Sequence, residues 1–178
     1  MSLGRLQKLV PPPKTPHKVG TEDEWRSKES SLRISLPREY MQLCQAYGTG
    51  WFDVNGRQVA LINLFDKAQI YTIKGNLGFS ESIKARQPKL FENGDSIYLW
   101  GAAFDCLNLC FVLQESGAYR ILAYPNDYDE LQMFDMTLPD FCVEMLSAKI
   151  EFSVIPAKEF EGDVAFRQYP RNQGRSRQ

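Results

Sequence analysis

The chain has 178 residues, of which 43% are hydrophobic and 24% charged, and this suits one folded domain with a sizeable core rather than two domains. No apolar run approaches the roughly 18–20 residues that span a bilayer, and the N-terminal MSLGRLQKLVPPPK lacks the apolar core of a secretory signal. We therefore expect a cytoplasmic protein that does not enter a membrane, with its four cysteines reduced.

The net charge is only −1, but it is distributed unevenly along the chain. Residues 1–91 hold 14 basic and 8 acidic side chains, residues 92–163 hold 3 and 14, and residues 164–178 hold 4 and none. An acidic segment of this strength disfavours nucleic acid, because phosphates are repelled, and it favours a basic protein partner. The alternative is that the acidic surface serves solubility alone.

The first elements follow from capping and turn residues. Residues 1–20 are rich in Pro and Lys and predict a flexible or extended leader. Thr21 and Glu24 have the spacing of a capping box and predict a helix over about 22–30, with Trp25 anchored in the core.

A second helix is predicted with Ser35 as its cap and Pro37 in its first turn, because a missing N–H costs nothing there. Gly48 and Gly50 end this helix. Its apolar stripe has helical spacing and consists of Tyr40, Leu43, Cys44 and Tyr47.

The remaining pattern indicates mostly strands. A hairpin around Asn55-Gly56 joins 51–54 to 58–65, and 66–86 is predicted helical with a break at its glycines. A closing helix over 138–146, capped by Thr137, precedes an edge strand at 150–154 and a polar, Arg-rich tail at 156–178. Between them, four strand-like runs cover 95–101, 106–114, 119–124 and 130–134. The predicted fold is α+β, one domain with an antiparallel sheet of about five to six strands and helices packed at its N- and C-terminal ends.

The sequence offers little for catalysis. The only histidine, His17, lies in the leader, and no nucleophile motif or phosphate-binding glycine loop is present. Cys106 and Cys110 lack further ligands at metal-binding spacing, and Asp127 to Glu130 lack the order of a calcium loop. We therefore expect no catalytic residue, no metal and no cofactor. A small hydrolase that relies on carboxylates is the weaker alternative.

Acidic residues in predicted loops and strand ends are the candidate binding residues, with two tyrosines as aromatic anchors beside them. The alternative for each acid is an ordinary solvated side chain. The candidates are Asp105, Tyr124, Asp127, Tyr128, Asp129, Glu130 and Asp135.

The order of the motifs resembles the SUKH superfamily, which includes bacterial immunity proteins and fungal regulators of cell-wall synthesis. The segment LPREY resembles the family's LP-x-x-Y helix opening, and YGTGWF resembles its helix-ending G-x-G-aromatic step. The resemblance covers residues 21–155 and leaves out the leader and the tail. Its matching positions are Trp25, Leu36, Pro37, Tyr40, Gly48, Gly50, Phe52, Trp100 and Gly101.

The resemblance implies an α+β fold without catalysis. Bacterial members bind a cognate toxin domain, often a nuclease, and block it in the producing cell. The acidic segment fits this role independently, since a nuclease is basic where it holds phosphate. The alternative is a regulatory or scaffold module that resembles the fungal members, with PPPKTP as a docking segment. The sequence does not predict an oligomeric state.

Overall fold

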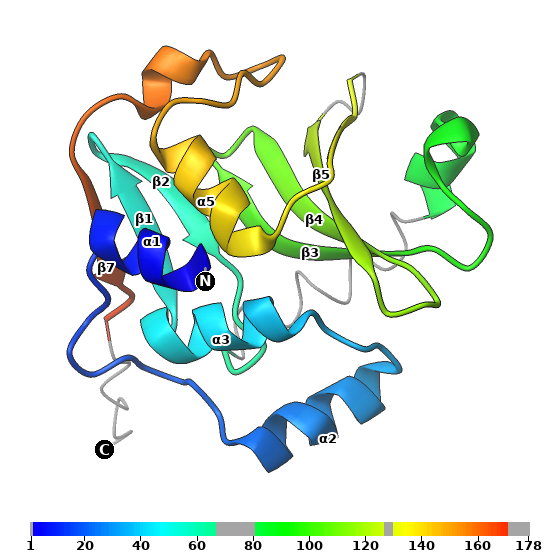
Figure 1. The fold of residues 1–178 in the computed structure, drawn as a ribbon, viewed down its shortest axis with the longest axis horizontal. Helices are drawn as coiled ribbons and strands as arrows, with labels where there is room; N and C mark the ends of the chain where they lie inside the picture. The colour runs from blue at the N-terminus through cyan, green and yellow to red at the C-terminus, as the bar shows by residue number, and fades with distance from the viewer. Residues whose placement is uncertain (1, 67–80, 127–129, 171–178) are drawn as a thin grey trace, which may run out of the picture.

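The computed structural model describes residues 2–66, 81–126 and 130–170 (Figure 1). Its α-helices are α1 (Ser2–Leu9), α2 (Glu22–Leu32), α3 (Arg38–Tyr47) and α5 (Leu138–Leu146), and residues 81–86 are also helical. Two short 3₁₀ helices are η1 (Pro88–Leu90) and η2 (Ala157–Phe160). The strands are β1 (Gly50–Val54), β2 (Arg57–Leu61), β3 (Ser96–Ala103), β4 (Leu107–Leu113), β5 (Tyr119–Pro125), β6 (Gln132–Phe134) and β7 (Val164–Gln168).

The seven strands form one antiparallel sheet in the order β6-β5-β4-β3-β2-β1-β7. Strands β1 to β6 therefore follow one another as neighbours, and β7 returns to pair with the free side of β1. The predicted α+β class is confirmed, with slightly more strands than the expected five to six. The predicted hairpin at Asn55-Gly56 is also confirmed, with positive φ angles of 51° and 81° that match the twist of the flanking strands.

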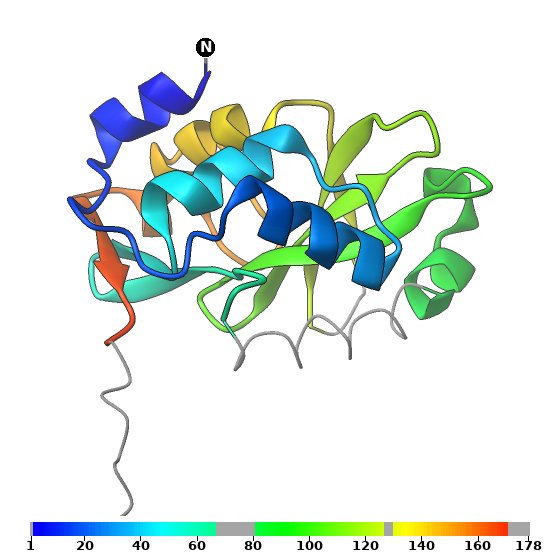
Figure 2. The same ribbon diagram turned by 90° about the horizontal axis from the view of Figure 1, so that it is seen from below.

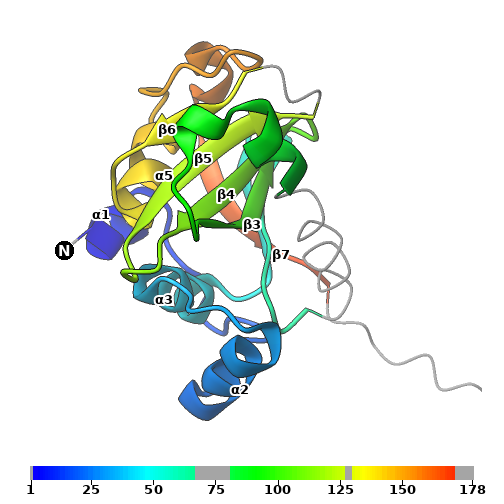
Figure 3. The ribbon, with the colours of Figure 1, turned by 90° about the vertical axis from the view of Figure 1, so that its right-hand side faces the viewer.

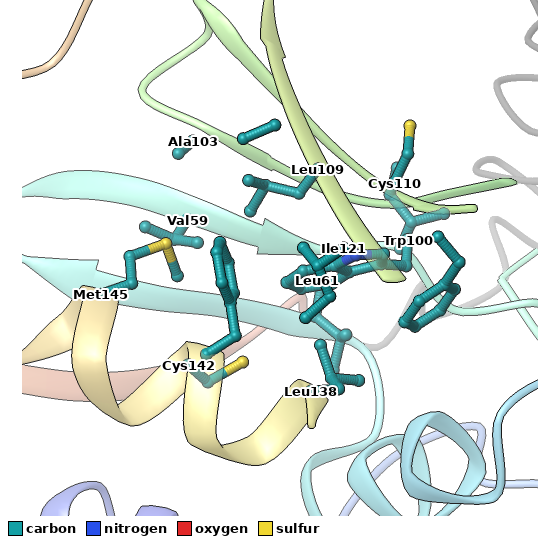
Figure 4. Packing of buried hydrophobic residues seen from close by; sticks show 14 of the residues in the cluster. Val59, Leu61, Trp100, Ala103, Leu109, Cys110, Ile121, Leu138, Cys142 and Met145 are labelled. Atoms are coloured by element: carbon teal, nitrogen blue, oxygen red, sulfur yellow. The ribbon is translucent and has the colours of Figure 1, made fainter. Parts of the chain in front are cut away.

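Helices α1, α3 and α5 lie together on one face of the sheet, and α2 lies beside α3 (Figures 2 and 3). The side chains of α5 point from the helix into the sheet, as Cys142 and Met145 show in Figure 4. Trp100 stacks on Phe111 and meets the ring of Phe141 edge-on, with centroids 5.8 and 6.0 Å apart. These aromatic contacts join the centre of the sheet to α5. Each described helix is too short or too polar to cross a lipid bilayer.

The residues of the family-like motifs have structural roles. Trp25, Tyr40 and Phe52 are at most 1% exposed. The capping box at Thr21 is present, and all four residues of the α3 stripe are completely buried. Gly48 ends α3 with a φ angle of 73°, and the backbone of His17 lies directly against it, so a side chain would be strained and would also clash. The cap of α3 differs from the prediction, since Pro37 is the N-cap residue and Ser35 makes no cap.

The prediction of a loose leader is wrong. Residues 2–9 form α1, and Leu6 and Val10 are completely buried. Their spacing places both on one side of the chain, and this side packs on α5 and α3. The following residues are held through their carbonyl groups, because Tyr47 Oη, Asn63 Nδ2 and Trp25 Nε1 donate hydrogen bonds to Val10, Lys18 and Val19 at 2.7, 3.1 and 3.0 Å.

The C-terminal predictions also need correction. Residues 150–154 form no strand, and the edge of the sheet is instead β7, which lies inside the predicted polar tail. The tail also contains a completely buried aromatic side chain, Phe160. Strand β2 ends at Leu61 rather than at residue 65. Of the region predicted helical, 81–86 is helical, and 67–80 lies outside the described residues.

Candidate functional site

Several exposed acidic residues lie in chain segments at the end of the sheet that holds the β1–β2 and β3–β4 turns. The backbone of this end runs along the upper margin of Figure 1. These acidic residues come from the β3–β4 turn, the connection into β6, the chain after α5 and the chain before β7. We call this surface the acidic edge, and it consists of Asp105, Glu130, Glu151, Glu161 and Asp163.

The turn that carries Asp105 is fixed by two asparagines. Asn126 Nδ2 donates a hydrogen bond to the Asp105 carbonyl at 2.9 Å, and Asn108 Nδ2 donates to Asn126 Oδ1 at 2.8 Å. Phe104 and Asp105 both have positive φ angles, 53° and 58°. Asp105 is exposed in this turn.

An aromatic layer supports the acidic edge from below. The ring of Phe104 stacks on Phe160 with centroids 4.8 Å apart, and Phe160 contacts Phe152 at 5.8 Å. The Arg57 guanidinium lies 5.3 Å from the centre of the Phe104 ring. The partly buried ring of Phe104 and the buried ring of Phe160 thus join the β3–β4 turn to η2.

Hydrogen bonds between side chains and the backbone fix the chain on either side of η2. Glu151 Oε2 accepts a hydrogen bond from the Ala157 amide at 2.9 Å, and Gln132 Nε2 donates to the Glu151 carbonyl at 3.1 Å. The Asn55 side chain donates to the Glu161 carbonyl. These bonds attach the acidic segment 151–163 to β6 and to the β1–β2 turn.

Basic residues near this surface are partly neutralised by other acids. Arg57 is paired with Glu159 at 2.8 Å, and Lys149 with Glu144 at 3.4 Å. Neither partner belongs to the acidic edge as defined above. Lys158 of η2 is a further exposed basic residue in this segment, but the five carboxylates of the acidic edge outnumber it, so the net charge of the surface is negative.

The structure divides the predicted binding residues into separate groups. Asp105 and Glu130 are exposed at the acidic edge, whereas Asp135 is exposed at the opposite end of β6. There it lines a hollow of about 590 Å³ together with Pro37 and Tyr119. The prediction for Tyr124 as a surface anchor is wrong, because this side chain is 2% exposed. The predicted residues Asp127, Tyr128 and Asp129 lie outside the described residues.

Sequence reasoning missed Glu151, Glu161 and Asp163. Their charge predicts that they are exposed, but it does not predict that they lie at the same end of the sheet. Glu151 reaches the acidic edge because its carbonyl accepts a hydrogen bond from the side chain of Gln132 in β6. Glu161 and Asp163 reach it because β7 returns to β1, where Val164 pairs with Val54 beside the hairpin turn. The motif pattern contained no signal for that return.

The buried thiols have no acid–base role at neutral pH. Burial raises the pKa of Cys142 to about 12, and it raises the pKa values of Cys44 and Cys110 further. A protonated thiol is a poor nucleophile and a poor metal ligand. Among residues 2–66, 81–126 and 130–170, no three His, Cys, Asp or Glu side chains are grouped so that they could share a metal ion.

Comparison with protein-family models, curated proteins and solved structures gives no match to this chain. Within the described residues, the acidic edge is the feature that best combines exposure, charge and a rigid support.

Proposed function

We propose that this chain is a non-catalytic, cytoplasmic protein-binding domain that neutralises a basic toxin domain by binding it with the acidic edge. The observation that carries the proposal is that five exposed acidic residues from separate chain segments lie at the same end of the sheet. The resemblance of the α2–α3–β1 motifs to SUKH immunity proteins supports the same role.

The physical basis is charge complementarity. A nuclease domain must be basic where it holds phosphate, and carboxylates on a rigid surface can occupy such a site. Opposite charges also accelerate encounter, with association rates that fall steeply as salt is added. Rigidity matters because carboxylates already held in place lose little conformational freedom on binding.

The test is a binding titration against the basic toxin-like domain encoded nearest to this chain. The double variant Asp105→Lys/Glu130→Lys changes two exposed residues of the acidic edge. The matched control, Glu115→Lys/Asp135→Lys, changes the net charge by the same amount at the opposite end of the sheet. We expect the first variant to weaken binding by at least about 100-fold at low salt and the control by less than about 10-fold, since rim charges contribute modestly.

Equal losses in both variants would mean that net charge rather than the acidic edge controls binding. No binding by the unmodified chain would remove the immunity proposal for that toxin domain. A protective effect in cells that express the toxin, lost with the first variant only, would give the same answer in vivo.

The second candidate is a regulatory interaction module, and its specific support is the exposure of Pro11 and Lys14 in the proline-rich segment. Deletion of residues 1–20 is a poor test of it, because the deletion removes the buried Leu6 and Val10. The substitutions Pro11→Ala and Lys14→Glu keep α1 in place. They should abolish binding of an endogenous partner under this alternative and leave toxin binding intact under the first.

A further inference from the structure

Strand β7 presents a backbone edge that pairs with no strand among the described residues. It stands last in the sheet order, next to β1, at the left margin of the sheet in Figures 1 and 2. The Tyr169 amide donates a hydrogen bond to the Thr49 carbonyl at 3.2 Å, so these two residues form a hydrogen-bonded pair.

This pair fixes the direction of every backbone group in β7. Since hydrogen-bonded pairs alternate along an antiparallel ladder, Arg167 and Ala165 also direct their N–H and C=O groups toward β1. The backbone groups of Val164, Phe166 and Gln168 therefore face outward from the sheet. They form a template for one more antiparallel strand.

The edge has only part of the usual protection against such pairing, since the segment after α1 contacts it at one end, where the Gln168 side chain donates a hydrogen bond to the Thr15 carbonyl at 3.2 Å. Edge strands of stable monomers are commonly very short, bulged, or interrupted by proline or lysine. Strand β7 pairs with β1 in a continuous register over all five residues. It contains no proline, and Pro170 lies after the strand. The opposite edge strand, β6, has only three residues.

Charge indicates which chain would pair with this edge. Glu161 and Asp163 are exposed directly before β7, and Arg167 is exposed within it, with its side chain 61% accessible. Arg167, which also lies 3.4 Å from Asp53 of β1, is near the end of the strand, whereas the two carboxylates precede its start. Two copies in antiparallel orientation therefore bring opposite charges toward each other.

We propose that β7 pairs with β7 of a second copy of this chain about a two-fold axis at Phe166, which joins the two sheets into one. This register overlaps all five residues of each strand. Val164 then pairs with Gln168 of the second copy, and Phe166 pairs with its own counterpart. These three hydrogen-bonded pairs give six new backbone hydrogen bonds. Such a self-complementary contact is the usual form of a two-fold dimer interface.

The register places the exposed Ala165 directly opposite Arg167 of the second copy, and Arg167 opposite Ala165. The two residues are a non-hydrogen-bonded pair, in which side chains lie closest. Ala165 also lies directly opposite Asp53 of β1 in the same copy. A charge at Ala165 therefore acts on the β1–β7 ladder as well as on the dimer, so the folding stability of each variant is measured beside its dimer constant.

The test is sedimentation equilibrium of the full chain and two variants at about 1 µM to 1 mM. The unmodified chain is expected to form a dimer. In the dimer each glutamate of the Ala165→Glu variant faces one Arg167 of the other copy, and the two such pairs should tighten the dimer about 2- to 30-fold. The like charges of Ala165→Lys should weaken it by a similar factor. Added salt should reduce both differences.

Matched controls are Ala85→Glu and Ala85→Lys, which make the same changes at an exposed position in the helical segment 81–86. They should leave the dimer constant unchanged, and circular dichroism should show that all four variants fold. A chain that remains monomeric at 1 mM overturns the proposal. The proposal is also overturned if substitutions at Ala85 change the dimer constant as strongly as those at Ala165. It is overturned as well if Glu and Lys at position 165 give the same dimer constant.

Discussion

The substitution Leu6→Ala tests whether α1 is part of the folded core. Leu6 is 0% exposed, whereas Leu9 of the same helix is 39% exposed, so Leu9→Ala is a matched control. The Leu-to-Ala change removes three carbon atoms, which corresponds to about 2.4 kcal/mol of transfer free energy, with a further cost if a cavity remains. We expect the lower part of the observed range, about 2–3 kcal/mol, because a terminal helix can shift to close part of the cavity.

The assay is urea denaturation followed by circular dichroism. For a chain of this size the expected loss lowers the melting temperature by roughly 4–12 °C, and Leu9→Ala should change stability by less than about 0.5 kcal/mol. Hydrogen exchange gives a second readout, since the Val10 amide donates to the Leu6 carbonyl at 2.7 Å. Equal stability of the two variants, with fast exchange at Val10, would refute the packing of α1.

Three further predictions concern the core. Asp95→Ala removes a carboxylate that is 2% exposed and lies 3.5 Å from Arg120. It should lower the free energy of unfolding, measured by urea denaturation, by about 1–3 kcal/mol. The control Asp163→Ala, at an exposed position, should lower it by less than about 0.5 kcal/mol. In the native state at pH 8, a thiol reagent should modify only Cys106, because the other three cysteines are buried; rapid modification of a second thiol would contradict their burial. The folded pKa of Cys142, about 12, exceeds its ordinary value of 9.0, so its contribution to stability is complete below pH 9 and is lost as pH rises from 9 to 12. Urea midpoints should fall over that range, and less steeply in a Cys142→Ala variant; equal slopes would contradict the raised pKa.

Elements with local signals were predictable from the sequence. The Thr21–Glu24 capping box and the Asn55-Gly56 turn each specify their geometry within four residues or fewer. Thr137 likewise caps α5 through its side-chain oxygen, which accepts from the Asp140 amide at 3.4 Å. These signals work because the interacting groups are neighbours in the chain.

Elements that depend on distant partners were not predictable in the same way. Helix α1 is short and would be marginal alone, and it is stabilised by burial of Leu6 and by ion pairs of Arg5 with Asp140 and Glu144 at 3.1 and 3.2 Å. Strand β7 needs the free edge of β1, more than a hundred residues earlier. Because this segment is polar and Arg-rich, the sequence predicted neither the register of β7 nor the contact of Phe166 with Tyr47.

For the acidic edge too, some properties were predictable from the sequence and others were not. Charge alone predicted an acidic surface and led correctly to exposed positions at Asp105 and Glu130. It could not separate these from Asp135, because the direction of β6 decides at which end of the sheet each residue lies. Nor could it exclude Tyr124, whose burial depends on what covers the sheet at that position.

The acidic edge and the β7 edge are geometrically related, and this relation links the two proposals. In an antiparallel β7 pair, the start of one strand lies beside the end of the other, so the two acidic edges point in opposite directions along the joined sheet. Asp163 of one copy then lies near the basic end of β7 in the other, while Asp105 and Glu130 lie several strands away. A basic partner should therefore bind each copy through Asp105 and Glu130 even when the dimer is formed. Asp163→Lys should weaken the dimer more than it weakens partner binding. Asp105→Lys should weaken partner binding more than it weakens the dimer. If either variant weakens both equally, a single surface serves both contacts.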